Sequence, residues 1–242
     1  LEYADLADSS ALFEPCLACL RAARSTGGLG ADDRVAYASV LENLGEAHLA
    51  LVRRGQAAAL DSAAACLGEA LAIRIEWKRR ARVDTRLALA EVERLRAVRA
   101  VERRAAAHWD AAEDWVRDAA ADLVADTAAV AARVPMWTER ARLLLDRDEH
   151  EHGRTRVRAA RAALDSAAAA LVAHPQQRPL AVIEWLRARA ARLGAPAHDP
   201  AAQIDALGHL AHARELMPAD QDMPFARLLA EEEAALHAGA QR

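Results

Sequence analysis

Aromatic residues are scarce in this 242-residue chain, where they make up 4% of the sequence, so a large core built on rings is excluded. No stretch approaches the roughly 18 uncharged apolar residues of a membrane span, and no basic segment followed by an apolar run occurs near residue 1. We therefore expect neither a transmembrane helix nor a signal peptide. The three cysteines do not form a disulfide framework, which favours a reducing compartment and a cytoplasmic location.

Alanine dominates what is present, with 65 residues against 8 prolines and 10 glycines. Alanine loses the least side-chain entropy in a helix and lets helices approach closely, so the composition predicts an all-α fold. Turn residues divide the chain into helical segments at roughly 10–25, 33–53, 56–80, 84–105, 108–132, 136–150, 154–173, 178–193, 200–216 and 221–238. We place helix starts at Asp84-Thr85 and at 108–110 because side-chain oxygens there can cap a new helix.

One segment occurs twice, since AALDSAAACL at 58–67 returns almost unchanged as AALDSAAAAL at 162–171. The offset of 104 residues is close to three repeats of about 34 residues. A second packing signal is Gly45, in the middle of a helical segment, where glycine costs about 1 kcal/mol relative to alanine. We expect Gly45 to lie where two helices meet, with Ala63 and Ala70 on the facing helix.

These packing residues follow the pattern of a tetratricopeptide repeat, with a first and a second helix. The residues of the first helix are Leu44, Gly45, Ala47 and His48, and those of the second are Ala63, Leu67 and Ala70. The chain therefore resembles a divergent tetratricopeptide array. Its long connection at 52–61 is similar to arrays in bacterial signalling proteins that carry CHAT-type proteases or STAND NTPases.

The resemblance implies an α-solenoid of antiparallel helix pairs, about ten helices wound as a right-handed superhelix in one domain, 1–242. The domain divides into an N-terminal helix in 1–30, about four divergent helix pairs in 33–216 and a capping helix at 221–238. First-helix positions would face a concave groove that holds a partner segment. The groove candidates are Glu42, Glu46, Leu49, Glu184 and Arg192.

Two clusters suggest metal chemistry, but both lack the spacing of a metal site. His150 and His152 lie two residues apart and would point about 200° apart on a helix, so a polar turn is the simpler interpretation. Cys16 and Cys19 form a CxxC without the second pair that structural zinc takes, so packing is the simpler interpretation there. No nucleophile or phosphate-loop motif occurs, and we predict no catalytic residue and no cofactor.

Charge alternates in blocks along the chain. The net charges are −5 over 1–73, +6 over 74–104, −6 over 105–153, +6 over 154–195 and −5 over 196–242. Such blocks either steer a partner or neutralise one another across helix contacts.

The leading function hypothesis is a non-catalytic scaffold or sensor module in bacterial signalling that binds a basic or amphipathic protein segment, with no membrane partner. One alternative is nucleic-acid binding through the Arg-rich segments, which the flanking acidic blocks disfavour. The other is a small-molecule or metal site, and oligomerisation is left open.

Overall fold

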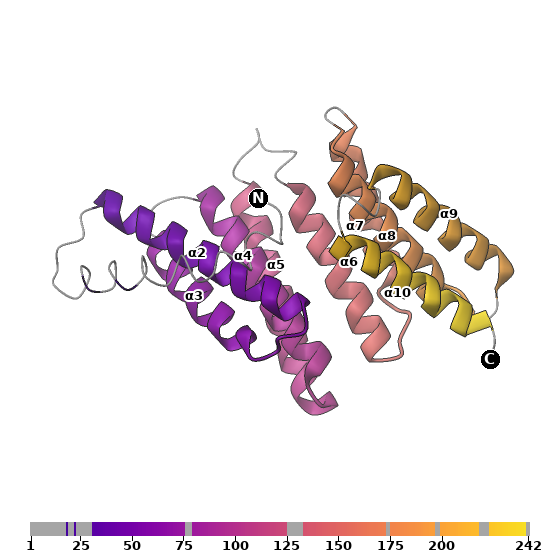
Figure 1. Cartoon of the computed structure of the whole chain (residues 1–242), viewed down its shortest axis with the longest axis horizontal. Helices are drawn as coiled ribbons and strands as arrows, with labels where there is room; N and C mark the ends of the chain where they lie inside the picture. The colour runs from indigo at the N-terminus through magenta and orange to yellow at the C-terminus, as the bar shows by residue number, and fades with distance from the viewer. Residues whose placement is uncertain are drawn as a thin grey trace. The chain divides into compact units, whose positions relative to one another are not determined.

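The structure is a computed structural model that describes Ala18, Ala22 and residues 31–75, 79–124, 133–172, 175–196, 199–217 and 223–240. Every regular element in these residues is an α-helix, so the predicted all-α class is confirmed. The helices belong to two compact units, divided between Asp126 and Thr127. Within each unit every helix packs on the next one along the chain, as in a helical-repeat array (Figure 1).

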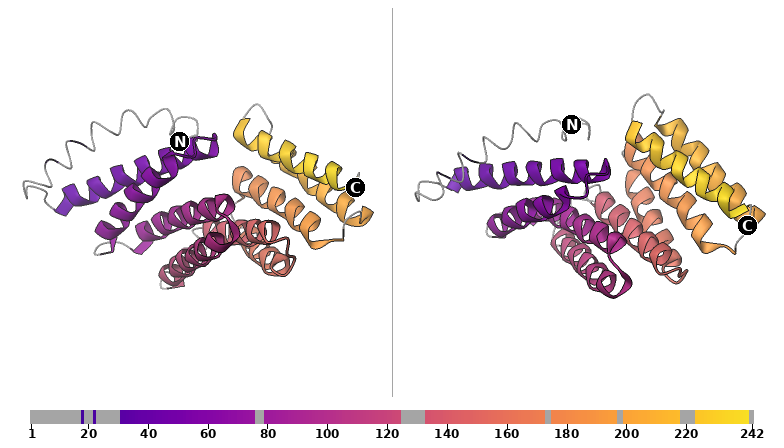
Figure 2. Two further views of the ribbon diagram at one scale, coloured as in Figure 1. Left: turned by 90° about the horizontal axis from the view of Figure 1, so that it is seen from below. Right: turned by 60° about the horizontal axis from the view of Figure 1, so that its bottom comes forward.

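Unit 1 contains four described helices, and the views of Figures 1 and 2 show them stacked in chain order. They are α2 (Ala31–Arg53), α3 (Ala59–Arg74), α4 (Arg79–Arg99) and α5 (Glu102–Val124). One apolar cluster joins α2, α3 and α4, and it includes Leu49, Leu67 and Val92. The α2–α3 pair thus rests on α4 through buried aliphatic side chains rather than rings.

The contact between α2 and α3 forms at Gly45, as the sequence predicts. A Cβ atom at this position would lie 2.6 Å from Leu67 Cγ, too close for any side chain. Ala63 and Ala70 on α3 are fully buried. Glycine here allows the two backbones to approach, which accounts for a residue that otherwise weakens a helix interior.

Two predicted helix starts are wrong, because Asp84-Thr85 lies inside α4 and 108–110 lies inside α5. The break falls instead at Ala100 and Val101. The Thr85 hydroxyl is fully buried and donates to Glu42 of α2 over 2.8 Å. A side-chain oxygen can bind a neighbouring helix as well as cap its own, and here the tertiary contact takes it.

Unit 2 contains five described helices: α6 (Arg133–His150), α7 (Val157–Leu171), α8 (Gln177–Gly194), α9 (Pro200–Leu216) and α10 (Met223–Ala240). Their common core includes Leu145, Leu164, Leu186 and Leu210. Asp199 caps α9 by accepting from the backbone N–H groups of Ala201 and Ala202, at 3.0 and 3.4 Å. The next residue, Pro200, needs no N–H partner at this position.

The predicted N-terminal helix lies outside the described residues, except for Ala18 and Ala22, which are helical. The last predicted helix, 221–238, corresponds to α10. None of the described helices has the length and apolar character needed to cross a membrane.

Candidate interaction surface

Carboxylates gather where α2 and α4 face each other. Glu42 and Glu46 stand one turn apart on α2, and Asp84 and Glu91 stand two turns apart on α4. We call these four residues the acidic face. Because a buried carboxylate is costly without a cationic or hydrogen-bonding partner, the contacts of each one decide what this face can bind.

Glu91 is buried, and arginines compensate its negative charge. Arg53 of α2 binds both of its carboxylate oxygens, with Nε 2.9 Å from Oε1 and Nη2 2.5 Å from Oε2. Arg94, one turn further along α4, lies 3.4 Å from Oε1. This two-pronged contact joins α2 to α4 and leaves little of Glu91 for an outside ligand.

Glu42 is also held internally. Arg74, at the end of α3, donates to Glu42 Oε1, and the Thr85 hydroxyl donates to the same oxygen over 2.8 Å. Arg74 Nη1 lies 2.8 Å from Thr85 Oγ1 as well, so the three groups close a triangle between α2, α3 and α4. The charge of Glu42 is therefore used to hold three helices together.

Glu46 differs from both neighbours because its charge is poorly compensated. Its one ion pair among the described residues is with Arg53 Nη2, at 3.9 Å, and that guanidinium is already engaged by Glu91. Burial raises the pKa of Glu46 to about 7; Arg53 opposes this, and the charges of Glu91, Glu42 and Asp84 add to it. With 31% of its side chain exposed, Glu46 remains within reach of a ligand.

This arrangement favours a cation from outside the chain. A positive group beside Glu46 would supply the charge that Arg53 does not, and it would pull the pKa of Glu46 down toward the ordinary carboxyl range. Glu46 is partly protonated near neutral pH, so binding a cation there would release a proton. The four side chains of the acidic face offer carboxylate oxygens to a cation.

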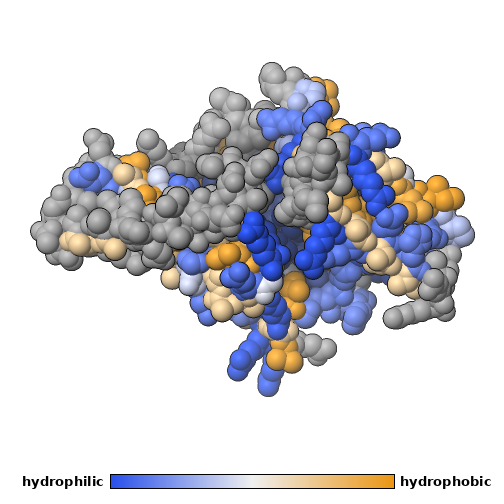
Figure 3. All heavy atoms as spheres, in the orientation of Figure 1, coloured by the Kyte–Doolittle hydropathy of each residue, from blue (hydrophilic) through white to orange (hydrophobic). Residues whose placement is uncertain are grey.

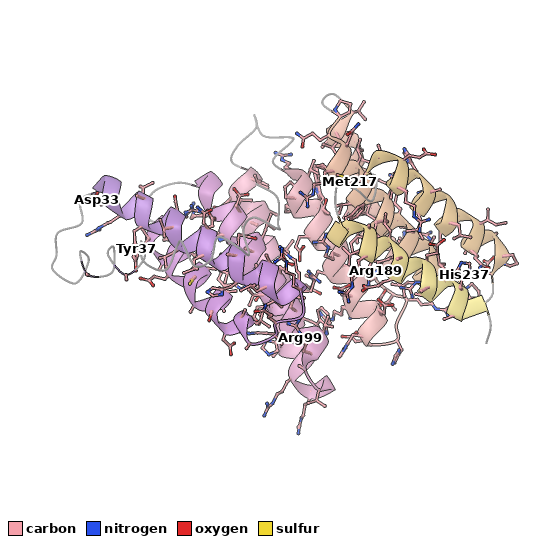
Figure 4. The ribbon with its side chains drawn as sticks, in the orientation of Figure 1. Asp33, Tyr37, Arg99, Arg189, Met217 and His237 are labelled. Carbon is pink, nitrogen blue, oxygen red and sulfur yellow. The ribbon has the colours of Figure 1, made fainter. Side chains whose placement is uncertain are left out.

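In unit 2 the corresponding helix pair, α6 and α8, is neutralised internally. Arg189 of α8 is buried and lies 2.8 Å from Asp146 and 2.6 Å from Glu149, both on α6. Its Nε lies 3.6 Å from Glu232 of α10, and its guanidinium stacks 5.5 Å from the centre of the Trp185 ring. Figure 4 shows Arg189 among the side chains of these helices. Burial alone would lower the pKa of Arg189, but the three carboxylates raise it.

The pKa of Glu149 therefore moves in the direction opposite to that of Glu46. Burial acts to raise it, but Arg189 and Arg192, whose Nη2 lies 2.8 Å from Glu149, bring it below the ordinary value. Arg192 also binds Glu232 of α10 at 2.5 Å. The two units thus differ: the α6–α8 carboxylates have close arginine partners, whereas Glu46 on the acidic face shares the more distant Arg53 with Glu91.

A four-residue network occurs in each unit and links three consecutive helices. It contains an aspartate, then an arginine and a glutamate one turn apart on the next helix, then a histidine on the helix after. In unit 1 the residues are Asp61, Arg96, Glu93 and His108, and in unit 2 they are Asp165, Arg187, Glu184 and His209. Asp61 and Asp165 are the aspartates of the repeated LDS segment.

The distances in the two networks match closely. The arginine lies 2.7 Å from both carboxylates in unit 1, and 2.9 and 2.8 Å from them in unit 2. The histidine Nδ1 lies 2.6 Å from the glutamate in both. These networks are a structural counterpart of the sequence repeat, and they show that helices α3 to α5 and α7 to α9 pack by the same contacts.

The alternating charge blocks neutralise one another at helix contacts. In the basic block 74–104, Arg74 binds Glu42, and Arg82 and Arg86 both bind Asp122. The basic block 154–195 is used in the same way by the pairs described above. Most of the arginines that could follow a phosphate backbone are therefore occupied, which weakens the nucleic-acid alternative.

Four of the five predicted groove residues are taken up by contacts within the chain: Glu42, as described above, and three more. Leu49 is fully buried in the apolar cluster of unit 1, so its prediction as a groove residue is corrected: the turn of α2 that carries it faces the core. Glu184 and Arg192 lie on α8 in unit 2, where Glu184 binds Arg187 and His209. Burial acts to raise the pKa of Glu184, but these two partners hold it below the ordinary value.

The weak metal candidates divide into two groups. Cys16 and Cys19 lie outside the described residues. His150 ends α6, and His152 follows in a turn with a φ of 51°. Within the part of the chain that the structure describes, no three His, Cys, Asp or Glu side chains are arranged to hold a metal ion.

No family model, curated protein or solved structure matches this chain. The likeness to tetratricopeptide repeats stays a prediction that rests on the packing residues of α2 and α3.

Proposed function

We propose that this chain is a non-catalytic interaction module that binds a basic, helical segment of a partner protein across the acidic face of α2 and α4. The observation that carries the proposal is the state of Glu46, a partly exposed carboxylate whose nearest cation is 3.9 Å away and shared with Glu91. A lysine or arginine of a partner would complete this ion pair. Neighbouring apolar residues of an amphipathic partner helix would add contact area along α2 and α4.

The wider setting is part of the same proposal. The resemblance to tetratricopeptide arrays of bacterial signalling proteins supports a scaffold or sensor role in such a protein. A cytoplasmic location is part of the same proposal.

The test uses two designed peptides of repeated Lys-Leu-Ala and Glu-Leu-Ala units, with their affinities for the whole chain measured by fluorescence anisotropy. We expect binding of the lysine peptide only. Glu46→Gln should weaken it about tenfold, the usual worth of a charge-assisted contact. The matched control is Glu215→Gln, because Glu215 of α9 is exposed and makes no ion pair within the described residues.

The dependence on pH gives a second readout. Between about pH 6 and pH 8 the wild-type affinity should rise, because the lysine peptide selects the ionised form of Glu46. The Glu46→Gln chain should lack this rise. Equal binding of the two peptides, or unchanged affinity in Glu46→Gln, would rule out the proposal.

A further inference from the structure

The turn between α4 and α5 exposes two valines. Val98 lies one residue before the end of α4 and Val101 one residue before the start of α5, with 45% and 79% of their surface exposed. The other described valines of α4, Val83 and Val92, are buried. Two branched aliphatic side chains at one helix junction leave apolar surface whose burial outside the chain would be favourable. We call residues 98–104 the α4–α5 tip.

The same tip carries three arginines that make no ion pair within the described structure. Arg99, Arg103 and Arg104 are all exposed. They contrast with the arginines of α4 that face other helices, such as Arg86 and Arg94, which are paired with carboxylates. The tip therefore carries three arginines whose charge no ion pair among the described residues compensates, with one acidic residue, Glu102, in the same stretch of sequence.

The pictures show this end of unit 1 directly. Figure 4 labels Arg99 near the end of α4. In Figure 3, hydrophobic spheres lie beside hydrophilic ones at the lowest part of the view. Val98 and Val101 thus share one end of the α4–α5 pair with three exposed arginines.

This combination fits one class of partner better than the others. A nucleic-acid backbone would bind the arginines but leave the valines in water. A partner helix would need a groove to lie in, and the tip is a projection. The surface of an anionic bilayer accepts both features, because its headgroups attract arginines and its acyl boundary takes up small apolar side chains.

We propose that the α4–α5 tip binds anionic lipid headgroups at a membrane surface, with Val98 and Val101 entering the interface between Arg99, Arg103 and Arg104. This differs from the sequence-based expectation of no membrane partner, which rested on the lack of a spanning helix. A surface contact needs no span. The proposal is independent of the acidic face, so Glu46→Gln should leave lipid binding unchanged.

The experiment is flotation of the whole chain with vesicles of roughly three parts phosphatidylcholine to one part phosphatidylserine, and with pure phosphatidylcholine vesicles. We expect binding to the anionic vesicles at about 0.1 M salt and loss of binding at about 1 M salt, where charges are screened within a few ångström. Each arginine near an anionic surface contributes about fivefold to partition; because Glu102 of the tip opposes one of the three, the net contribution is about 25-fold.

Two variants of the tip separate its charge from its apolar part. Arg103→Glu with Arg104→Glu should abolish flotation, and Val98→Ser with Val101→Ser should reduce it about tenfold. The control is Arg154→Glu with Arg158→Glu, two exposed arginines of unit 2 that make no ion pair within the described residues. All of these side chains are exposed, so circular dichroism should show unchanged helix content.

Loss of flotation in the charge-reversed variant and about tenfold weaker flotation in the serine variant, with the control unaffected, would support the proposal. Equal flotation with both kinds of vesicle, or none with either, would overturn it. So would flotation that tolerates the serine variant, because a purely ionic contact fits any polyanion. In that case a gel shift of duplex DNA that depends on Arg103 and Arg104 would assign the tip to nucleic acid instead.

Discussion

Neutralising Glu46 tests the electrostatic account of the acidic face without any knowledge of the partner. The substitution Glu46→Gln keeps the shape of the side chain and its hydrogen-bonding capacity while removing its charge. Because burial and three neighbouring carboxylates disfavour that charge, the variant should be more stable than the wild type at alkaline pH. Substituting a glutamate that had a good partner would have the opposite effect.

The expected gain in the free energy of unfolding follows from the pKa shift of Glu46. Raising the pKa of a carboxyl from 4.5 to about 7 corresponds to about 3 kcal/mol of cost for the ionised form. The Glu46 side chain is 31% exposed, however, and solvent screens part of this cost. We therefore expect Glu46→Gln to raise the free energy of unfolding by about 1 to 2 kcal/mol at pH 8.

The direction of the pKa shift of Glu46 determines the pH range in which the stability of the wild type changes. Between about 4.5 and 7 the folded chain holds a proton on Glu46 that the unfolded chain has released, so this group makes the wild type lose stability as pH rises through that range. Below about pH 4.5 both states are protonated, and the difference between wild type and variant should vanish.

The assay is urea unfolding followed by circular dichroism at about pH 4.5, 6 and 8, with hydrogen exchange to show that α2 and α4 gain the protection. Asp114→Asn is the control, because Asp114 is 60% exposed and its one ion pair among the described residues is with Arg117 on the surface of α5. A stability difference between Glu46→Gln and wild type that does not change with pH would refute the reasoning, whatever its size.

Three further substitutions test packing by urea unfolding. Gly45→Ala should cost about 1 to 3 kcal/mol because its Cβ would overlap Leu67, and a double-mutant cycle with Leu67→Ala should show strong coupling; additive effects would contradict the contact. Leu49→Ala should cost about 2 to 5 kcal/mol, and its folded fraction should still bind the lysine peptide; selective loss of binding would restore Leu49 as a groove residue. Glu232→Gln weakens the pairing of Arg192 with α10 and should cost about 1 to 3 kcal/mol, seen first as faster hydrogen exchange in α10; exchange confined to unit 1 would refute this.

Packing could be predicted from this sequence because it depends on residue size and spacing. Gly45, Ala63 and Ala70 are small residues at positions that helix periodicity places on facing surfaces, and the structure brings them together. The LDS segment predicted a repeat from ten residues of similarity. Its aspartates, Asp61 and Asp165, occupy the same place in the two matched networks.

Ionic partners could not be predicted, because an arginine reaches several carboxylates and sequence gives no distance between helices. Thr85 illustrates the problem: as a capping residue it would begin a helix, but it is buried beside Glu42 within α4. Leu49 illustrates another, since a groove position and a core position lie less than one turn apart on α2. Less than one turn of helix thus separates the partly exposed Glu46 from the buried Leu49.

The comparison of the two units explains why Glu46, rather than any carboxylate of unit 2, is the candidate contact. The Asp–Arg–Glu–His networks show that the two units use the same packing between their later helices. Their first helices differ: α6 presents Glu149 to two arginines of α8, whereas α2 presents Glu46 to the single guanidinium of Arg53. Under the proposed function, a partner supplies a further cation at Glu46, while the packing of unit 1 rests on the other contacts described above.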